Sequence, residues 1–465
     1  MAPISAESGY VGNLTADQEA KLRQLWSIIL KLNEVGPFQD VSLENSQDSR
    51  PQSAQRRNSS LTKTLSNTSS NLPSDLNKTL MSVGIKQTEL KAVCDGLNKV
   101  TIDEIRRSLL STAKQDHPDA LVLRFLRARK WDVSKSFGMM LEALIWRVKE
   151  QHVDEKVVSN SELLALHQSQ NKQKPADAKA GETFLAQMRM GKCIMETKDK
   201  QGRPVGIVAA RLHKPSEQSE EVIKRFILHV IESTRLLLVP PIESANILFD
   251  MTGFSLSNME YAPVKFLIDC FQANYPESLG VMLIHNAPWV FSGIWKIIKG
   301  WMDPVIVSKV HFTYNAKDLE KHIDLANLPK NLGGTSDKEY KFVEPVEGEN
   351  AMMEDTVTRD AIIAERAKIG EDLLKETGAW IDAVSENNPD KVAEVKKRRD
   401  AVIENMRLNY WKLDPYVRGR SQPDRLGMIQ GGGKINFDGS PVAEVETKAL
   451  EVEHIESAQA NAVKA

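Results

Sequence analysis

Residues 181–336 alternate short apolar runs with helical stretches, and this alternation constrains the fold more than any other feature of the sequence. The helical stretches cover about residues 218–238, 258–273 and 289–302, and the apolar runs between them have the length of strands. Strands joined through helices of this length require crossover connections, which produce a mainly parallel sheet covered by helices. We therefore predict an α/β domain. The predicted strands are KCIMET near residue 192, PVGIVAA near 204, ANILFD near 245, LGVMLIHN near 279 and VHFTY near 310.

Two helical regions precede this domain. Residues 1–38 contain an amphipathic helix that begins at a capping box formed by Thr15 and Gln18. Residues 80–150 are predicted to form a second helical region, in which residues 101–150 look helical throughout and Asp132 is placed to cap one of the helices. We expect an all-helical N-terminal subdomain before the sheet.

Residues 39–79 separate these two helical regions. Ser, Asn and Thr dominate this segment, which contains no aromatic residue and no sustained period, so we predict a disordered insertion. Two arginines precede Ser59 in the run Arg56-Arg57-Asn58-Ser59, a pattern that basophilic kinases recognise. Ser59 is therefore a candidate phosphosite, although Ser-rich linkers produce such matches easily.

Residues 337–465 form an extension that becomes helical again from about 351 to 412. We expect KVAEVKKRRD to be a solvated charged face and Leu408, Trp411 and Leu413 to pack against the rest of the chain. The final stretch, with GGGK and a tail rich in Ala, Glu and Val, is predicted to be loosely ordered.

The composition excludes several classes of protein. The chain has 465 residues, of which 41% are hydrophobic and 27% charged, and its formal net charge of -2 is too balanced to favour nucleic acid. Any membrane contact must therefore be local. The start MAPISAESGY lacks the basic and apolar regions of a signal peptide, and no run approaches ~18 apolar residues. We expect a cytoplasmic protein without a spanning segment.

Motifs of catalysis and metal binding are missing from the sequence. There is no G-x-S-x-G and no H-E-x-x-H, and GMIQGGGKI lacks the first glycine and the final Ser or Thr of a phosphate loop. Cys94, Cys193 and Cys270 are isolated from one another, which excludes C-x-x-C metal and redox patterns. We expect neither enzymatic activity nor a metal or cofactor.

The helical stretch PWVFSGIWKIIKGWMDP, residues 288–304, contains three of the eight tryptophans of the chain. At 100° per residue its apolar side chains cover an arc of roughly 160°, wider than the ~100° that a surface helix needs to cover a core. Three explanations stay open from the residues alone. The extra surface packs in the core, contacts a membrane, or lines a cavity that holds an apolar molecule.

Four motifs in sequence order resemble the CRAL-TRIO family of lipid-binding proteins, especially its fungal phosphatidylinositol transfer proteins. The motifs are HPDALVLRFLRARKWDV, NYPESLGVMLIHNAPWVF, WMDPVIVSKV and LANLPKNLGG, and together they span roughly residues 100–336. The resemblance implies a sheet and helices that enclose an apolar lipid pocket.

The resemblance also implies a role for the tryptophan-rich helix. In this family the equivalent helix is a mobile gate over the pocket, so its wide apolar face would contact lipid chains when closed and membrane when open. The expected gate residues are Trp289, Phe291, Ile294, Trp295, Ile298 and Trp301.

Four positions match residues that bind the phosphatidylinositol head group in the family, namely Arg129, Lys130, Glu277 and Lys309. Cations satisfy a phosphate through charge-assisted hydrogen bonds, and a carboxylate accepts hydrogen bonds from inositol hydroxyls. A structural network of ion pairs is the competing explanation. Phosphatidylcholine is a doubtful ligand, because Ser278 follows Glu277 where relatives that bind it carry Arg.

The resemblance therefore predicts a lipid-transfer protein that exchanges one bound phosphatidylinositol between membranes. Two alternatives remain, a carrier of a sterol-like or isoprenoid hydrocarbon and a lipid-sensing scaffold for a partner enzyme. The expected partners are a phospholipid, transient peripheral contact with internal membranes and a lipid-metabolising enzyme, with no nucleic acid.

Overall fold

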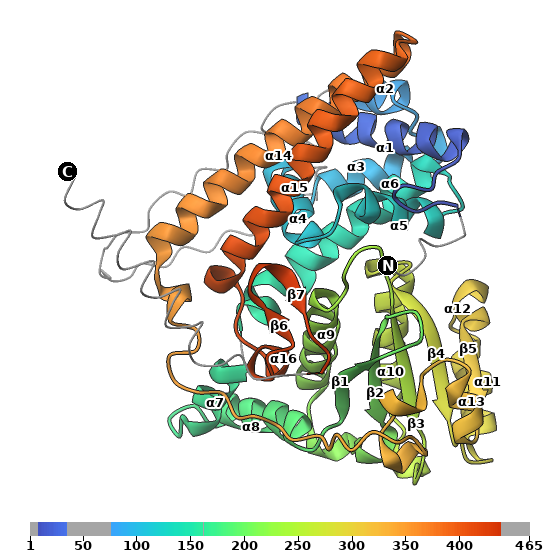
Figure 1. Ribbon diagram of the computed structural model, residues 1–465, viewed down its shortest axis with the longest axis vertical. Coiled ribbons are helices and arrows are strands. Elements are labelled where there is room, and N and C mark those ends of the chain that lie inside the picture. The colour runs from blue at the N-terminus through green and yellow to red at the C-terminus, as the bar shows by residue number, and fades with distance from the viewer. Residues whose placement is uncertain (1–7, 35–75, 161, 439–465) are drawn as a thin grey trace, which may run out of the picture.

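The computed structural model describes residues 8–34, 76–160 and 162–438. In Figure 1 the sheet and its helices occupy the lower half of the molecule, while the N-terminal helices and a long pair of C-terminal helices occupy the upper half. Ser59, the candidate phosphosite, lies outside the described residues. So does most of the predicted insertion, although the helix α2 begins at Leu76, within its last four residues.

The upper half begins with six α-helices and two π-helical turns. Their bounds are α1 (Ala16–Glu34), α2 (Leu76–Ser82), α3 (Gln87–Leu97), α4 (Ile102–Ala113), α5 (Pro118–Ala128), α6 (Val133–Ile145), η1 (Trp146–Glu150) and η2 (Val153–Val158). Local signals fix several of these starts. The predicted capping box of Thr15 and Gln18 is present, and Asp132 caps α6 by accepting a hydrogen bond from the backbone N–H of Lys135.

The lower half holds a five-stranded sheet with helices between its strands. Its elements are α7 (Glu162–Gln170), α8 (Pro175–Arg189), β1 (Cys193–Lys198), β2 (Pro204–Ala209), α9 (Glu220–Leu236), β3 (Ala245–Asp250), α10 (Tyr261–Asp269), η6 (Cys270–Asn274), β4 (Leu279–His285), α11 (Phe291–Lys299), α12 (Pro304–Ser308), β5 (Val310–Thr313) and α13 (Ala316–Glu320).

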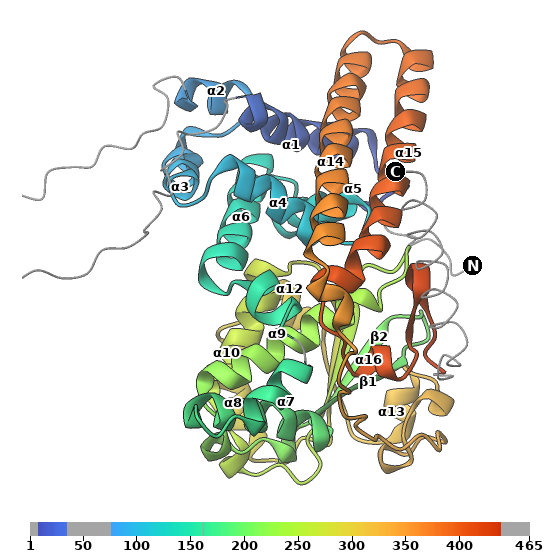
Figure 2. The same cartoon turned by 90° about the vertical axis from the view of Figure 1, so that its left-hand side faces the viewer.

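The strand order is β1-β2-β3-β4-β5, with β1 antiparallel to β2 and every other pair parallel. This confirms the predicted α/β class and mainly parallel sheet. Side chains alternate between the two faces of each strand. Leu248 and Leu283 pack toward α13 on one face, whereas Phe249 and Ile284 point to the other face, where α9, α10 and α11 lie. Figure 2 shows α9 and α10 on one side of the sheet and α13 on the other.

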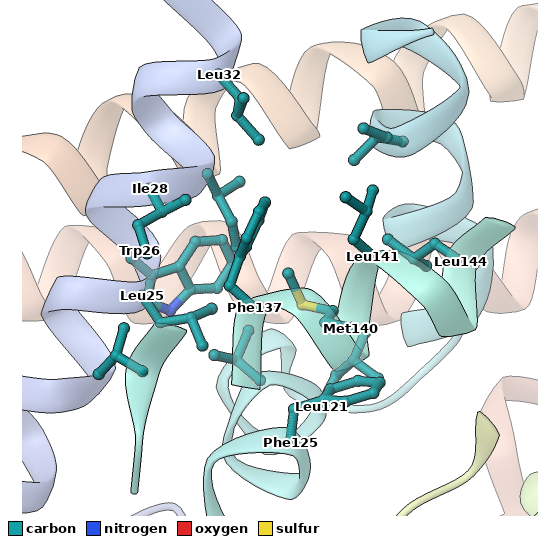
Figure 3. Packing of buried hydrophobic residues seen from close by; sticks show 14 of the residues in the cluster. Leu25, Trp26, Ile28, Leu32, Leu121, Phe125, Phe137, Met140, Leu141 and Leu144 are labelled. Atoms are coloured by element: carbon teal, nitrogen blue, oxygen red, sulfur yellow. The ribbon is translucent and has the colours of Figure 1, made fainter. Parts of the chain in front are cut away.

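The C-terminal extension is a helical hairpin followed by a short strap. Its elements are α14 (Thr356–Ser385), α15 (Pro389–Val417), α16 (Gln422–Arg425), β6 (Ile429–Gln430) and β7 (Lys434–Ile435). Figure 2 shows α14 and α15 side by side, reaching well beyond the sheet. Residues of both helices, such as Leu373 and Met406, share one buried core with α1 and α3 to α6. Figure 3 shows part of that core, in which Trp26 of α1 faces Phe137 of α6.

A buried ion pair joins the hairpin to the N-terminal helices. Both guanidinium Nη atoms of Arg399 donate to the Asp119 carboxylate, at 2.6 and 2.7 Å, and the indole N–H of Trp26 donates to the same carboxylate at 2.7 Å. Burial alone would raise the pKa of Asp119, but the charge and hydrogen bonds of Arg399 outweigh burial and lower it. The carboxylate is therefore ionised in the folded protein near neutral pH.

Three expectations about the extension are wrong. KVAEVKKRRD is not a fully solvated face, since it contains Arg399 and the buried Val395. Leu408 is exposed, while Trp411 is partly buried and Leu413 is buried as expected. The GGGK run is ordered between β6 and β7, and a Cβ added to Gly433 would lie 2.3 Å from Nε1 of Trp411. Only glycine allows the strap to approach the indole this closely.

Candidate ligand-binding site

A large apolar cavity lies between one face of the sheet and the helices α9, α10 and α11. Its volume is about 260 Å³, room for many water molecules at the ~10–15 Å³ that each requires. Its walls are almost entirely hydrocarbon, which suits an apolar ligand better than water. The apolar side chains that line it include Val208, Ile223, Phe226, Val230, Ile247, Phe249, Met251, Phe254, Val264, Leu267, Phe271, Met282, Ile284, Phe291, Trp295, Ile298 and Met302.

The helix α11 forms one wall of this cavity. Phe291, Trp295 and Ile298 line the cavity directly, and Ile294 is buried in the cluster behind them. The apolar arc expected for this helix therefore includes an inward face that borders a cavity, which was one of the three open explanations.

Exposed apolar side chains lie on this helix and directly beside it. Ile297 of α11 is 48% exposed, Trp289, two residues before the helix, is 88% exposed, and Trp301, two residues after it, is 36% exposed, and none of these three side chains lines the cavity. The ring of Trp301 packs edge-on against Tyr261 at 5.5 Å, which extends the exposed apolar surface toward α10. We call the exposed apolar side chains of this region the outer patch, namely Tyr261, Trp289, Ile297, Trp301 and Val305.

At the end of the cavity where the parallel strands begin, Glu277 and Lys309 form an ion pair. Glu277 precedes β4 and Lys309 precedes β5, and neighbouring parallel strands begin at the same edge of the sheet. The Lys309 ammonium is 3.3 Å from a Glu277 carboxylate oxygen and donates to the carbonyl of Leu279 at 2.9 Å. Ser278, which lies beside Glu277, lines the cavity. Glu277 and Lys309 themselves do not line the cavity, so the pair stands beside this end of the cavity and not in its wall.

A buried network holds the turn that carries Glu277. Tyr275 donates its hydroxyl to Glu232 at 2.7 Å, and Glu232 also contacts Arg147 at 2.7 Å and Lys114 at 3.0 Å. Burial and the charge of Glu232 raise the pKa of Tyr275 well above its ordinary value, so it stays a hydrogen-bond donor. Glu277 itself has a φ of 56°, in the left-handed region that non-glycine residues rarely adopt. Such a conformation persists only where the surroundings impose it.

Arg129 and Lys130, the other two expected head-group residues, lie at the end of α5. Lys130 has a φ of 51° in the turn that ends the helix, and its side chain is exposed, while Arg129 is partly exposed. Within the described residues, no side-chain hydrogen bond or ion pair joins either cation to Glu277 or Lys309. The structure therefore brings together two of the four expected residues and leaves the other two separate.

A polar cluster at the opposite end of the cavity was not anticipated from the sequence. Lys192, His213, Asn258 and Glu260 all line the cavity. They lie where β2 and β3 end. Lys192 belongs to this end because it precedes the antiparallel strand β1, and its carbonyl accepts a hydrogen bond from the N–H of Ala209, the last residue of β2. We call Lys192, His213 and Glu260, together with Gln218, the distal cluster.

Hydrogen bonds connect the members of the distal cluster in a chain. The Lys192 ammonium donates to the side-chain oxygens of Gln187 at 3.0 Å and Gln218 at 3.3 Å. The Gln218 amide lies 3.3 Å from Nδ1 of His213, and Nε2 of His213 lies 2.9 Å from Glu260. Burial lowers the pKa of Lys192 to about 8, so the side chain is mainly an ammonium at pH 7.

No sequence pattern could have identified the distal cluster. Its residues come from the loop before β1, the loop after β2 and the loop after β3, and none shares a motif with another. A lysine beside a strand is ordinarily solvated. Only the fold shows that Lys192 is 5% exposed and borders a cavity.

None of the helices in the described ranges combines the length and the apolar character that crossing a bilayer requires.

Two family descriptions match the chain: "CRAL/TRIO domain" over residues 188–334 and "CRAL/TRIO, N-terminal domain" over residues 86–142.

Curated relatives match over most of the chain. A CRAL-TRIO domain-containing protein of Schizosaccharomyces pombe is 38% identical over 91% of this chain and 92% of its own length. Phosphatidylinositol transfer protein CSR1 of Eremothecium gossypii is 39% identical over 70% of this chain and 72% of its own length. The solved structure of Sfh5 aligns at 20% identity with a TM-score of 0.37, over 50% of this chain and 76% of its own.

Proposed function

Since this chain belongs to the CRAL-TRIO family, we propose that it binds one phosphatidylinositol molecule in the cavity and exchanges it between membranes. The observation that carries this proposal is the apolar cavity bounded by α11, with an ion pair at the edge where β4 and β5 begin. The relative CSR1 is named as a phosphatidylinositol transfer protein, which supports the choice of lipid.

The energetics of exchange require a cavity of this kind. The two acyl chains of a phospholipid contain about thirty methylenes, and exposing them to water costs about 0.8 kcal/mol each, or tens of kcal/mol in total. A protein can carry the lipid only if its cavity replaces the bilayer interior. Exchange between two apolar surroundings is then nearly neutral, so the protein needs no chemical step and no energy source.

In this proposal α11 is the gate. Its inward side chains Phe291, Trp295 and Ile298 would contact acyl chains while the helix covers the cavity. The outer patch would enter the boundary between head groups and acyl chains, where tryptophan is favoured by its large ring and polar N–H. The exposed Lys296 and Lys299 of α11 would add attraction to anionic lipids. In this proposal the protein works in the cytoplasm and makes transient peripheral contact with internal membranes.

The head-group residues have distinct roles in the proposal. Lys309, with Arg129 and Lys130, would donate charge-assisted hydrogen bonds to phosphate, and Glu277 would accept from inositol hydroxyls. The Glu277–Lys309 pair is also what a purely structural ion pair would look like. Measurements of lipid loading by Glu277 and Lys309 variants separate the two explanations.

Transfer of phosphatidylinositol is expected to exceed transfer of phosphatidylcholine by at least about tenfold under one set of vesicle conditions. Choline offers no hydroxyl to Glu277 and adds a cation near Lys309, so it loses about one hydrogen bond to a charged group, about 1.5–3 kcal/mol. The measurement is movement of each labelled lipid from donor to acceptor vesicles, together with mass spectrometry of lipid that copurifies with the protein. Equal rates, or the absence of phosphatidylinositol from the extract, would contradict the proposal.

Removing both outer tryptophans, in the variant Trp289→Ala with Trp301→Ala, is expected to weaken vesicle binding by at least about tenfold. Two large apolar side chains that would be buried in the interface are lost. Sedimentation of the protein with phospholipid vesicles measures the binding. Val357→Ala, which removes an exposed apolar side chain on α14, is the control and should leave vesicle binding unchanged. If the double variant binds vesicles like the unmodified protein, the outer patch is not the membrane surface.

A further inference from the structure

A second, smaller cavity lies between the N-terminal helices and the turn that precedes β4. Its volume is about 30 Å³, enough for about two or three water molecules at ~10–15 Å³ each. The polar side chains of its lining include Thr112 of α4, Arg124 of α5, Arg147 of η1, Arg235 of α9 and Tyr275. Among the described residues that line it there is no Asp or Glu. We call this cavity the arginine pocket.

Three buried polar atoms of these lining residues have no hydrogen-bond partner in the described part of the chain. They are Nε of Arg124, Nε of Arg147 and Oγ1 of Thr112. The two arginines are 5% and 3% exposed, so bulk solvent does not satisfy their Nε–H groups. Leaving such a donor unpaired inside a protein is costly, and more so when the group is charged. The lining therefore supplies cationic donors that a small acceptor in the pocket can satisfy.

The ion pairs around the pocket leave one positive charge uncompensated. Within the described residues they form a closed network of four cations and three carboxylates. The members of this network are Lys114, Arg124, Arg147, Arg235, Asp116, Asp154 and Glu232. Burial lowers the pKa of Lys114, the charge of Glu232 opposes this effect, and the charges of Arg235 and Arg147 add to it. With all members ionised, an anion in the arginine pocket would offset the excess.

Size and charge together decide which ligand suits the pocket. A water molecule can accept from the Nε–H groups, but it leaves the excess charge in place. A phosphate has four oxygens around a central atom, which exceeds a space for about two or three water molecules. A chloride ion is only slightly larger than a water molecule, accepts from several donors at once and supplies the missing charge. Guanidinium is also more weakly hydrated than ammonium, so it is well suited to buried contact with an anion.

We propose that the arginine pocket binds one chloride ion, which accepts hydrogen bonds from Nε of Arg124, Nε of Arg147 and the hydroxyl of Thr112. Since the pocket is lined by α4, α5 and η1 on one side and by Tyr275 on the other, the ion stabilises the contact between the helical half and the sheet. Arg235, Leu238 and Ser278 line both this pocket and the large apolar cavity, so the two spaces are neighbours. The inference does not rest on the proposed function, because no lipid takes part in it.

The first test locates the ion directly in crystals of the unmodified full chain. Crystals grown in sodium bromide are compared with crystals grown in sodium chloride, because the anomalous scattering of bromide identifies the ion. The expected result is a bromide peak in the arginine pocket, within hydrogen-bond distance of both Nε atoms. A water molecule or a lipid phosphate in the pocket, or bromide bound only elsewhere as an adventitious ion, overturns the inference.

The second test measures the stability of the unmodified protein in solution. Urea denaturation is followed in mixtures of sodium chloride and sodium gluconate at constant ionic strength, since gluconate is too large for the pocket. The unfolding equilibrium constant is expected to fall at least about fivefold between chloride-free buffer and about 0.2 M chloride, and the effect is expected to saturate. An unfolding constant that does not depend on chloride, or that falls without saturation, contradicts a single bound ion.

The variant Arg124→Lys connects the chloride effect to the pocket. It retains the charge that pairs with Asp116 and removes the Nε–H donor. The stabilisation by chloride is expected to disappear or to need at least about tenfold more chloride. The matched control is Arg398→Lys, a change on the surface where Arg398 pairs with Glu376 and Glu394, and it should keep the full chloride effect. A full effect in Arg124→Lys, or an equal loss in both variants, means that chloride does not act in this pocket. If Arg124→Lys does not fold, the two tests on the unmodified protein still decide the question.

Discussion

Replacing Asp119 with Ala is expected to lower the free energy of unfolding by about 3–5 kcal/mol, because the substitution leaves the charge of Arg399 buried and unpaired. Trp26 also loses the acceptor of its indole N–H. The measurement is urea denaturation of the full chain followed by circular dichroism. An exposed pair between the same two helical regions provides the control: Lys396→Ala removes the contact of α15 with Glu19 of α1 and should cost about 1 kcal/mol or less.

Removing both charges distinguishes the cost of an unpaired charge from the value of the pair. The variant Asp119→Ala with Arg399→Met is expected to recover part of the loss, since apolar replacements for a buried ion pair are often nearly neutral. If the free energy of unfolding of the double variant is instead clearly lower than that of Asp119→Ala, the explanation by an unpaired buried charge is wrong.

Glu277→Ala and Lys309→Ala are each expected to lower phosphatidylinositol loading at least tenfold. Each removes charge-assisted hydrogen bonds to the head group, which are worth about 1.5–3 kcal/mol. The measurement is the amount of copurified phosphatidylinositol per mole of folded protein. Lys321→Ala, which breaks the exposed pair with Asp318 on α13, is the matched control and should load normally.

The same samples separate head-group binding from a structural role of the pair. If Glu277 and Lys309 only support the turn before β4, both variants will be less stable, yet their folded fraction will carry lipid at the unmodified level. That result would remove these two residues from the site and leave the cavity assignment standing.

The sheet could be predicted from the sequence because its strands are continuous apolar runs. A parallel sheet is covered on both faces, so runs such as ANILFD and LGVMLIH stand out against the helices between them. The caps at Thr15 and Asp132 were equally accessible, since their partners lie three residues away. These features depend on residues close together in the chain, so short sequence patterns are enough to predict them.

The features that could not be predicted depend on partners far away in the chain. Arg399 stands in a run of charged residues that resembles a solvated face, and only contact with Asp119 explains its burial. Gly433 belongs to a run that resembles a linker, and its role follows from Trp411. Periodicity describes which residues share a helical face, but it does not say what that face meets.

The candidate site divides in the same way. The motifs predicted Glu277 and Lys309 as head-group residues, and the structure shows that they contact each other next to Ser278, which lines the cavity. The arc of α11 indicated an unusually wide apolar surface, but it could not show that Phe291 faces inward while Ile297 faces outward. Lys192 gave no signal, because its burial comes from loops that only the folded sheet brings together.

The ion pair of Asp119 with Arg399 can form only late in the synthesis of the protein. The two residues are 280 positions apart, and ribosomes add about 5–20 residues per second, so Asp119 waits about 14–56 s for its partner to be made. During that interval α14 and α15 have not yet been made, so they do not cover the surfaces of α1, α4 and α5 that they bury in the folded protein. The whole sheet is synthesised within the same interval, so it can fold beneath an unfinished helical half. The last helices of the chain then complete the core that the first helix began.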